Sequence, residues 1–237
     1  MKLTLIGTPL GNLDDLSLRS IKALFSLDVI IAEDTRMYIK LRNLIAERFP
    51  EILKSLNLPL EHRPELISYR EQNHDRVFQN ILKIILEGKS AGMITDAGLP
   101  TISDPGFRLV RDLVTENIEV DIIPGPTAID SALAISALPT DRFAFIGFLP
   151  RERSKIYKIF EKFDLTEITV IYYESPFRIL KTLEILKEKY PEIKVALIND
   201  LTKKFQKIIR GDISEAIEIL IKQKVQGEWV VCVRISK

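Results

Sequence analysis

The stretch that decides the fold is AGMITDAGLPTISDPG, residues 91–106. Its apolar beginning, Ala91–Ile94, predicts a short buried strand, and residues 107–114 resume with helical spacing. The connection between them carries two acids, two glycines and two prolines. A strand, a stiff Gly/Pro loop and a helix start are how open α/β sheets build ligand sites at strand ends. The sequence therefore predicts an α/β protein with a preshaped loop at 95–106.

The two acids of this loop have different expected roles. Asp104 is expected to be the N-cap of the following helix, with Pro105 at its first position. Asp96 is needed for no cap, and a carboxylate at a strand end suits a sugar hydroxyl or a cation. The alternative is a strand-to-helix connection that binds no ligand.

Length and composition limit the class of protein. The 237 residues allow one large domain or two small ones, and 46% hydrophobic with 28% charged residues is ordinary for a globular protein. No apolar run approaches the roughly 20 residues that cross a bilayer. Nothing at Met1 resembles a signal peptide, so a cytoplasmic protein without membrane contact is expected.

Few residues can serve as metal ligands or nucleophiles. The single cysteine, Cys232, excludes an internal disulfide and is expected to be a buried strand thiol. His62 and His74 are expected on the surface or in loops, and no G-x-S-x-G elbow accompanies them. No close His/Cys/carboxylate cluster predicts a metal site. With a net charge of +1, nucleic-acid contact must come from a local basic patch.

The strand and helix patterns run twice along the chain. Pro139 lies in the best predicted boundary, which gives domains at 1–138 and 139–237. Each domain is expected to hold about five strands with helices between them. Loops that follow strands are expected at 7–13, 33–36, 69–74, 95–106, 124–128, 173–178 and 199–204. Such loops share one side of an open sheet, so a cleft between the two units is the expected site.

The known phosphate-binding loops are absent from this sequence. It contains neither a Walker A loop nor the dinucleotide motif G-x-G-x-x-G. The chemistry must then come from a bound organic cofactor or from positioning.

Several segments together resemble one family in order and spacing. They are LTLIGTPLGNLDDLSLR (3–19), AEDTR (32–36), TDAGLPTISDPGFRLV (95–110), IPGPTA (123–128), LPTDRF (138–143), GFLPR (147–151), YESPFR (173–178) and LTK (201–203). The chain resembles the ribosomal small-subunit RNA 2′-O-ribose cytidine methyltransferases of the tetrapyrrole methylase superfamily. The resemblance implies two α/β domains with S-adenosylmethionine in a cleft between them, and a homodimer.

The resemblance also implies which residues contact the cofactor. They are Leu10, Asp96, Ala97, Gly98, Ile102, Ser103, Thr127, Ala128, Tyr173, Glu174 and Ala196. For Ile102, Ala128 and Ala196, simple core packing is the alternative. On the substrate side, Asp34 is the candidate general base, accompanied by Glu33 and Arg36. A structural ion-pair network of these three residues at a strand end is the alternative.

Two basic patches are candidates for RNA contact. Arg151, Arg153, Lys155 and Lys158 form the first, and Lys203, Lys204, Lys207 and Arg210 form the second. Solvated charged faces are the alternative. The expected partner is small-subunit ribosomal RNA or the assembled 30S subunit.

The sequence departs from the family pattern at several points. Tyr69-Arg70-Glu71-Gln72-Asn73 stands where the family usually has Tyr-His-Glu-His-Asn, and Phe177 interrupts its Ser-Pro-His-Arg. Many members also carry a small C-terminal extension beyond the final strand. Two other functions stay open: a methyltransferase of the same fold acting on a small molecule such as a tetrapyrrole, and a binding module without turnover.

Overall fold

The computed structural model describes residues 1–164 and 166–235. The chain divides into two compact units, Met1–Pro126 and the residues from Thr127 onward. The division precedes the boundary expected after residue 138, because helix α6 (Ala128–Ile135) packs against strand β10 (Trp229–Arg234) of the second unit.

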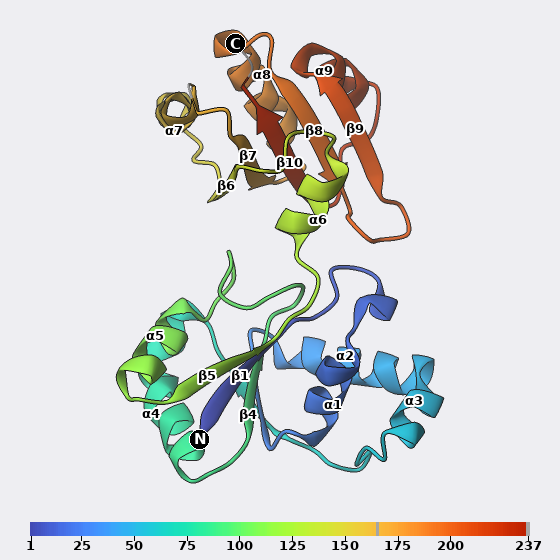
Figure 1. Ribbon diagram of the computed structural model, residues 1–237, viewed down its shortest axis with the longest axis vertical. Helices are drawn as coiled ribbons and strands as arrows, with labels where there is room; N and C mark the ends of the chain where they lie inside the picture. Colours follow the sequence, from blue (N-terminus) through green and yellow to red (C-terminus); the bar gives the residue numbers. More distant parts are fainter. Residues whose placement is uncertain (165, 236–237) are drawn as a thin grey trace. The chain divides into compact units, whose positions relative to one another are not determined.

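The first unit is built on a parallel sheet (Figure 1). Its strands are β1 (Lys2–Ile6), β2 (Val29–Ala32), β3 (Glu65–Ser68), β4 (Ala91–Ile94) and β5 (Glu119–Ile123). They lie in the order β3-β2-β4-β1-β5, and every neighbouring pair is parallel. All four residues of β2 and of β4 are buried, as expected for central strands covered on both faces.

Helices cover both faces of this sheet. Buried side chains of α1 (Leu18–Ser26), α2 (Thr35–Arg48) and α3 (Pro50–Ser55) form one apolar cluster with strand residues. Those of α4 (His74–Leu86) and α5 (Phe107–Thr115) form the other. Short 3-10 turns precede α1 and α4, at η1 (Leu13–Asp15) and η2 (Glu71–Asn73).

The strand order creates a switch point between β1 and β4. These neighbours are followed by helices on opposite faces, α1 after β1 and α5 after β4. Their connections therefore diverge at the carboxyl ends of the strands. In open α/β sheets a ligand crevice forms where neighbouring connections diverge in this way.

The second unit holds a mixed sheet. Its strands are β6 (Phe143–Phe148), β7 (Thr169–Glu174), β8 (Lys194–Asn199), β9 (Lys207–Asp212) and β10, in the order β6-β7-β10-β8-β9. Only β6 and β7 pair in parallel. The helices besides α6 are α7 (Arg153–Phe160), η3 (Glu161–Phe163), α8 (Ile179–Lys189) and α9 (Ile213–Ile221).

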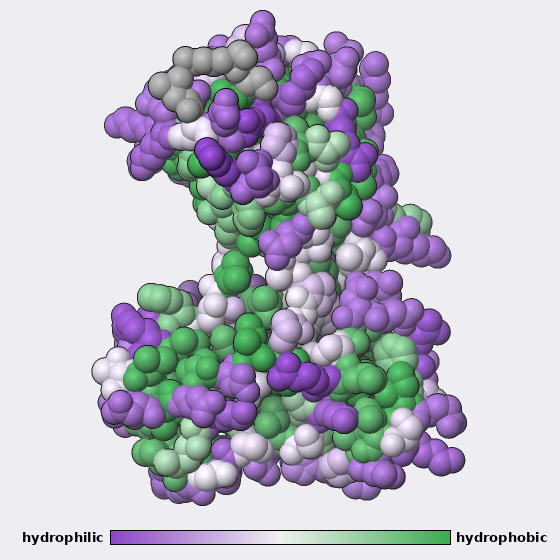
Figure 2. Space-filling view, in the orientation of Figure 1, coloured by the Kyte–Doolittle hydropathy of each residue, from purple (hydrophilic) through white to green (hydrophobic). Residues whose placement is uncertain are grey.

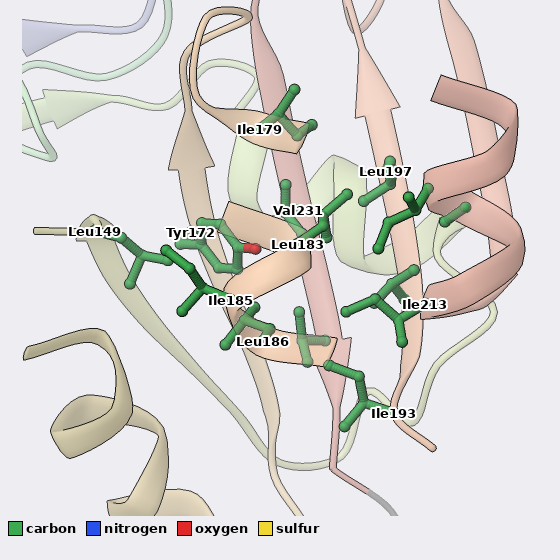
Figure 3. Close-up of a cluster of buried hydrophobic side chains, with 14 of the residues drawn as sticks. Leu149, Tyr172, Ile179, Leu183, Ile185, Leu186, Ile193, Leu197, Ile213 and Val231 are labelled. Atoms are coloured by element: carbon green, nitrogen blue, oxygen red, sulfur yellow. The ribbon is translucent and has the colours of Figure 1, made fainter. Parts of the chain in front are cut away.

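The core of the second unit lies between its sheet and the helices α8 and α9 (Figure 3). Leu183 and Leu186 of α8 and Ile213 of α9 meet Leu197 of β8 and Val231 of β10. All of these side chains are fully buried. The i, i+3, i+4 spacing of apolar residues in α8 produces this buried stripe.

The α/β class and the five strands in each unit are confirmed. Cys232 is buried in β10 as predicted, and burial raises the pKa of its thiol to about 12. The stretch after residue 50 begins with α3, and Gly211 lies inside β9. Within the described residues, no helix is long and apolar enough to span a membrane.

Truncating the second core tests its energetic weight. We expect Leu183→Ala to lower the free energy of unfolding by about 3 kcal/mol, because a buried leucine loses its contacts and leaves a cavity. Lys181→Ala on the exposed side of α8 is the control and should change stability by less than about 0.5 kcal/mol. Urea unfolding of both variants makes the comparison, and equal effects would contradict this core assignment.

Candidate functional site

The loops that follow β1 and β4 are joined by their backbones. Thr8 N donates to Gly98 O at 2.9 Å, and Gly98 N donates to Thr8 O at 3.1 Å. The buried Thr8 hydroxyl also donates to Thr95 O at 3.1 Å. The two loops therefore form one structure at the switch point of the first sheet.

The loop after β5 joins the same structure through a glycine pair. Gly7 N donates to Ile123 O at 2.9 Å. A Cβ atom built on Gly7 would lie 2.5 Å from Gly125 Cα, and one built on Gly125 would lie 2.7 Å from Gly7 Cα. Only glycine at both positions permits this approach of two backbones.

The 95–106 loop has an unusual backbone. Gly98 and Gly106 have φ values of 84° and 131°, and the non-glycine residues Thr101 and Ser103 also have positive φ, at 78° and 63°. Thr101 N donates to Pro105 O, and Gly106 N donates to Glu71 Oε1 at 2.7 Å. Left-handed non-glycine residues cluster at ligand sites, where surrounding contacts hold them.

The expected cap by Asp104 is wrong. Helix α5 begins at Phe107, with Gly106 as its N-cap and no side-chain cap bond. The positive φ of Gly106 turns the chain after Pro105, so the proline stays outside the helix. Burial raises the pKa of Asp104 to about 6, with the charges of Glu33 and Asp96 adding to the rise and Thr95 opposing it.

Asp96 presents an uncommitted carboxylate at the end of β4. Its side chain is exposed, and no described residue pairs with it or bonds the backbone amides of Asp96 and Ala97. Partial burial raises its pKa and the nearby Asp34 charge adds to the rise, whereas Arg70 opposes it. The carboxylate and the two amides are therefore available to a ligand.

Asp34 has a structural role in the described fold. It is the N-cap of α2 and accepts from Arg36 N at 2.9 Å, and the Arg36 guanidinium pairs with its carboxylate at 2.6 Å. These bonds lower the pKa of Asp34 to about 2. The Asp34–Arg36 pair matches part of the alternative interpretation, whereas Glu33 has no ion pair among the described residues. A role of Asp34 as base stays a prediction.

The cofactor residues predicted in the first unit lie together on the bridged loops. They are Leu10, Asp96, Ala97, Gly98, Ile102 and Ser103. Leu10 Cδ2 lies 3.3 Å from the Cβ position of Gly98, and the Ile102 side chain is 43% exposed on the same loop. An exposed apolar side chain, free amides and a free carboxylate suit an adenosyl cofactor, which has apolar, hydroxyl and ammonium parts.

The polar side chains predicted in the second unit are engaged within it. Thr127 caps α6, accepting from Asp130 N at 3.2 Å. Glu174 is buried and accepts from Ser175 N and from the Thr182 hydroxyl, at 2.9 and 2.7 Å. Any cofactor contact of Glu174 must therefore use its backbone.

The remaining predicted residues of this unit differ in exposure. Ala196 is fully buried in β8, in line with the core-packing alternative, and Ala128 is partly buried at the start of α6. Tyr173 is partly exposed, with its ring 4.9 Å from that of Phe145 and 5.5 Å from that of Phe148. Their cofactor contacts stay predictions.

Ion pairs occupy part of the two basic patches. Arg153 pairs with Glu188 at 2.7 Å, and Lys203 pairs with Glu228 at 2.7 Å and with Asp200 at 3.2 Å. Lys207 donates to Gln223 and Arg210 to Ile135 O. Among the described residues, Arg151 and Lys204 have no ion pair, although Lys204 lies over the Phe205 ring. Fewer charges are free than the sequence suggests.

The structure adds a cavity that the sequence did not predict. It measures about 630 Å³ and is lined by Glu33, Arg70, Glu71, Gln72, Asn73, Arg76 and Pro105. Apart from Arg76, its lining comes from three of the expected strand-end loops, 33–36, 69–74 and 95–106.

The expectation that His74 lies on the surface was wrong. It is 2% exposed, with Tyr69 OH 3.0 Å from Nδ1 and Asp112 Oδ2 2.9 Å from Nε2. Its partners come from the end of β3 and from α5, so no local sequence pattern indicated that His74 is buried.

The pKa of Asp104 generates a pH prediction. Its folded-state pKa of about 6 exceeds the ordinary 3.8, so the folded protein binds this proton more tightly between those values. The stabilisation is complete below about pH 4 and is lost as pH rises through 6. We expect Asp104→Asn to lack this loss. Over this pH range, the change in its free energy of unfolding should differ from that of the wild type by about 1–2 kcal/mol, after allowance for partial exposure.

Urea unfolding at a series of pH values makes this measurement. Asp34→Asn is the control of opposite sign, because a lowered pKa contributes stability that is lost as pH falls from about 4 to about 2. Parallel wild-type and Asp104→Asn curves over pH 4 to 7 would contradict the burial of this carboxyl.

Comparison with known proteins identifies the family. The profile of the Tetrapyrrole (Corrin/Porphyrin) Methylases matches residues 2–217. The chain is 38% identical to ribosomal RNA small subunit methyltransferase I of Thermotoga maritima, over 97% of this chain and 96% of that protein. It is 36% identical to the protein of the same name from Bacillus subtilis, over 99% of this chain and 75% of that protein.

Solved structures share the fold at low identity. Diphthine synthase superposes with a TM-score of 0.70 at 11% identity, covering 99% of this chain and 90% of the other. Cobalt precorrin-4 methyltransferase superposes with a TM-score of 0.66 at 18% identity, covering 98% and 94%. The switch-point loops and these matches agree, and the chain belongs to the tetrapyrrole methylase family, within the group of ribosomal RNA small subunit methyltransferase I.

Proposed function

We propose that this chain transfers a methyl group from S-adenosylmethionine to the 2′-hydroxyl of a cytidine ribose in small-subunit ribosomal RNA. The observation that carries the proposal is the 38% identity over 97% of the chain to a ribosomal RNA small subunit methyltransferase. A fold neighbour with a TM-score of 0.58, uroporphyrin-III C-methyltransferase, has been crystallised with S-adenosylhomocysteine, which supports this class of cofactor.

The cofactor would supply both the methyl group and its leaving group, so the protein needs to bind and orient. The free carboxylate of Asp96 and the amides of Asp96 and Ala97 would hold polar parts of the cofactor. Ile102 would cover an apolar part. The Thr8–Gly98 bridge fixes the loop before binding, which lowers the entropic cost of ordering it.

An assay with purified protein tests this function. We expect tritium transfer from labelled cofactor to 30S subunits or their RNA, and none to a porphyrinoid. Mapping ribose methylation in cells with and without the protein identifies the nucleotide. Transfer to the porphyrinoid alone would favour the small-molecule alternative, and cofactor binding without any transfer would favour the binding module.

Asp96→Ala tests the cofactor loop directly. We expect calorimetry to show at least a tenfold weaker affinity for S-adenosylmethionine, because the free carboxylate is lost from the proposed site. Glu116→Ala, at the exposed end of α5, is the matched control and should bind normally. Equal affinities of wild type and Asp96→Ala would remove this residue from the cofactor site.

Asp34→Asn tests the base. Asparagine caps a helix as well as aspartate does, so the variant removes the charge while keeping the cap. Because a pKa of about 2 makes a weak base, we expect turnover within about tenfold of wild type at unchanged cofactor affinity. A loss of about 100-fold or more would instead support Asp34 as the group that removes the hydroxyl proton.

The expected homodimer also belongs to this proposal. Apolar residues reach the surface of the first unit over α5 and the edge strand β5 (Figure 2), where Phe107, Val114 and Ile122 are 62, 55 and 45% exposed. Such groups are typical of protein contacts. Light scattering at several concentrations tests the oligomeric state.

The proposed ribosomal substrate also implies that the protein is cytoplasmic.

A further inference from the structure

The cavity at the carboxyl ends of β2 and β3 adjoins the 95–106 loop without being part of it. Glu33 follows β2, Arg70 follows β3, and Arg76 lies in the first turns of α4. Pro105 of the loop forms one wall. The bond from Gly106 N to Glu71 Oε1 ties the loop to the cavity lining at 2.7 Å.

Two arginines in this lining are uncommitted. The guanidinium groups of Arg70 and Arg76 are exposed and have no hydrogen bond or ion pair with any residue that the structure describes. Several other arginines of the first unit are paired: Arg36 with Asp34, Arg108 with Asp75 and Arg111 with Asp112. Arg19 also has no hydrogen-bond or ion-pair partner among the described residues, but it does not line this cavity, whereas Arg70 and Arg76 both do.

The backbone of this segment is fixed by Asn73. Its side-chain oxygen accepts from Arg70 N at 2.9 Å, and its nitrogen donates to Ser68 O at 3.0 Å. Arg70 therefore projects from a held turn rather than from a loose loop. The guanidinium needs to lose only side-chain freedom when it binds.

The acids of the lining do not neutralise both arginines. Glu71 is directed by its bond to Gly106 N, and Glu33 is partly buried with no ion pair in the described chain. The Arg36 contacts lower the pKa of Asp34 and the charge of Arg70 adds to this effect, whereas at Asp96 the charge of Arg70 opposes the rise in pKa that burial causes. The cavity is therefore lined both by Pro105 of the proposed cofactor loop and by the unpaired guanidinium groups of Arg70 and Arg76.

We propose that Arg70 and Arg76 bind a backbone phosphate of the RNA substrate in this cavity, next to the nucleotide that is methylated. The identity of the anion as RNA rests on the proposed function. A guanidinium donates two parallel hydrogen bonds to phosphate oxygens, and two such groups can grip one phosphate from two sides. The exposed Gln72 amide in the same lining can donate to the adjoining nucleotide.

Binding of a short single-stranded RNA from the small subunit, measured by fluorescence anisotropy over a series of KCl concentrations, tests the proposal. Each phosphate contact contributes about 0.7 to the slope of log affinity against log salt for single strands. In the double variant R70Q/R76Q we expect at least a tenfold loss of affinity and a slope shallower by about 0.7 or more. Cofactor affinity by calorimetry should stay within about twofold.

A matched variant isolates the site from general charge. Lys54→Gln removes an exposed cation from α3, which packs on the opposite face of the first sheet, and should leave affinity and slope unchanged. The variant R70K/R76K keeps the charge but loses the planar forks, so it should keep most of the slope and lose affinity. Circular dichroism verifies that the variants fold.

The outcomes separate this proposal from the function on which it rests. An unchanged salt slope in R70Q/R76Q overturns the phosphate site even if the wild type methylates ribosomal RNA. Equal loss of RNA and cofactor affinity also overturns it, since the arginines would then serve the cofactor. If the wild type binds RNA with this slope but transfers no methyl group, the site stands and the proposed function falls. If it binds no RNA, both fall.

Discussion

The close approach of Gly7 and Gly125 is the constraint on which the rest of the site depends. With their backbones this near, the connections after β1 and β5 leave the sheet together, and the Thr8–Gly98 bridge adds the connection after β4. A side chain on either glycine would force them apart. These contacts hold the Gly98 end of the 95–106 loop, which also contains the left-handed residues Thr101 and Ser103.

The elements of the fold were predictable because their signals are local. The apolar run Ala91–Ile94 predicted the central strand β4, and the helical spacing of residues 107–114 predicted α5. The cap of α5 was not predictable in the same way. Asp104-Pro105 has the composition of a helix start, but Gly106 is held by Glu71 from a distant part of the chain, and the helix begins after it.

The strand-end loops that make up the candidate site were predictable from the sequence, whereas the partners of their side chains were not. A parallel sheet brings the loops that follow its strands to one edge. The resemblance grouped Asp96 with Leu10 and Ile102, and this grouping agrees with the position of their loops at the switch point. Whether a charged group is free depends on partners far along the chain. The Glu174 carboxylate accepts a hydrogen bond from Thr182, and Lys203 forms an ion pair with Glu228. Neither side chain is therefore as available to a ligand as its motif suggests.

Whether a charged side chain already has a hydrogen-bond or ion-pair partner in the fold therefore distinguishes structural residues from those that can bind a ligand. Asp34 carries a charge at a strand end, yet its cap and its pair with Arg36 account for it without any substrate. The side chains of Asp96, Arg70 and Arg76 have no such partner among the described residues. An exposed charged group on a fixed backbone is available to a ligand. Arg70 replaces a histidine usual in the family, and a guanidinium keeps its charge at any physiological pH. Asp96 lies at the start of the 95–106 loop, and Arg70 and Arg76 line the cavity that Pro105 of the same loop borders. This arrangement suits the proposed reaction, which would bring a cationic sulfonium and an anionic RNA strand close together.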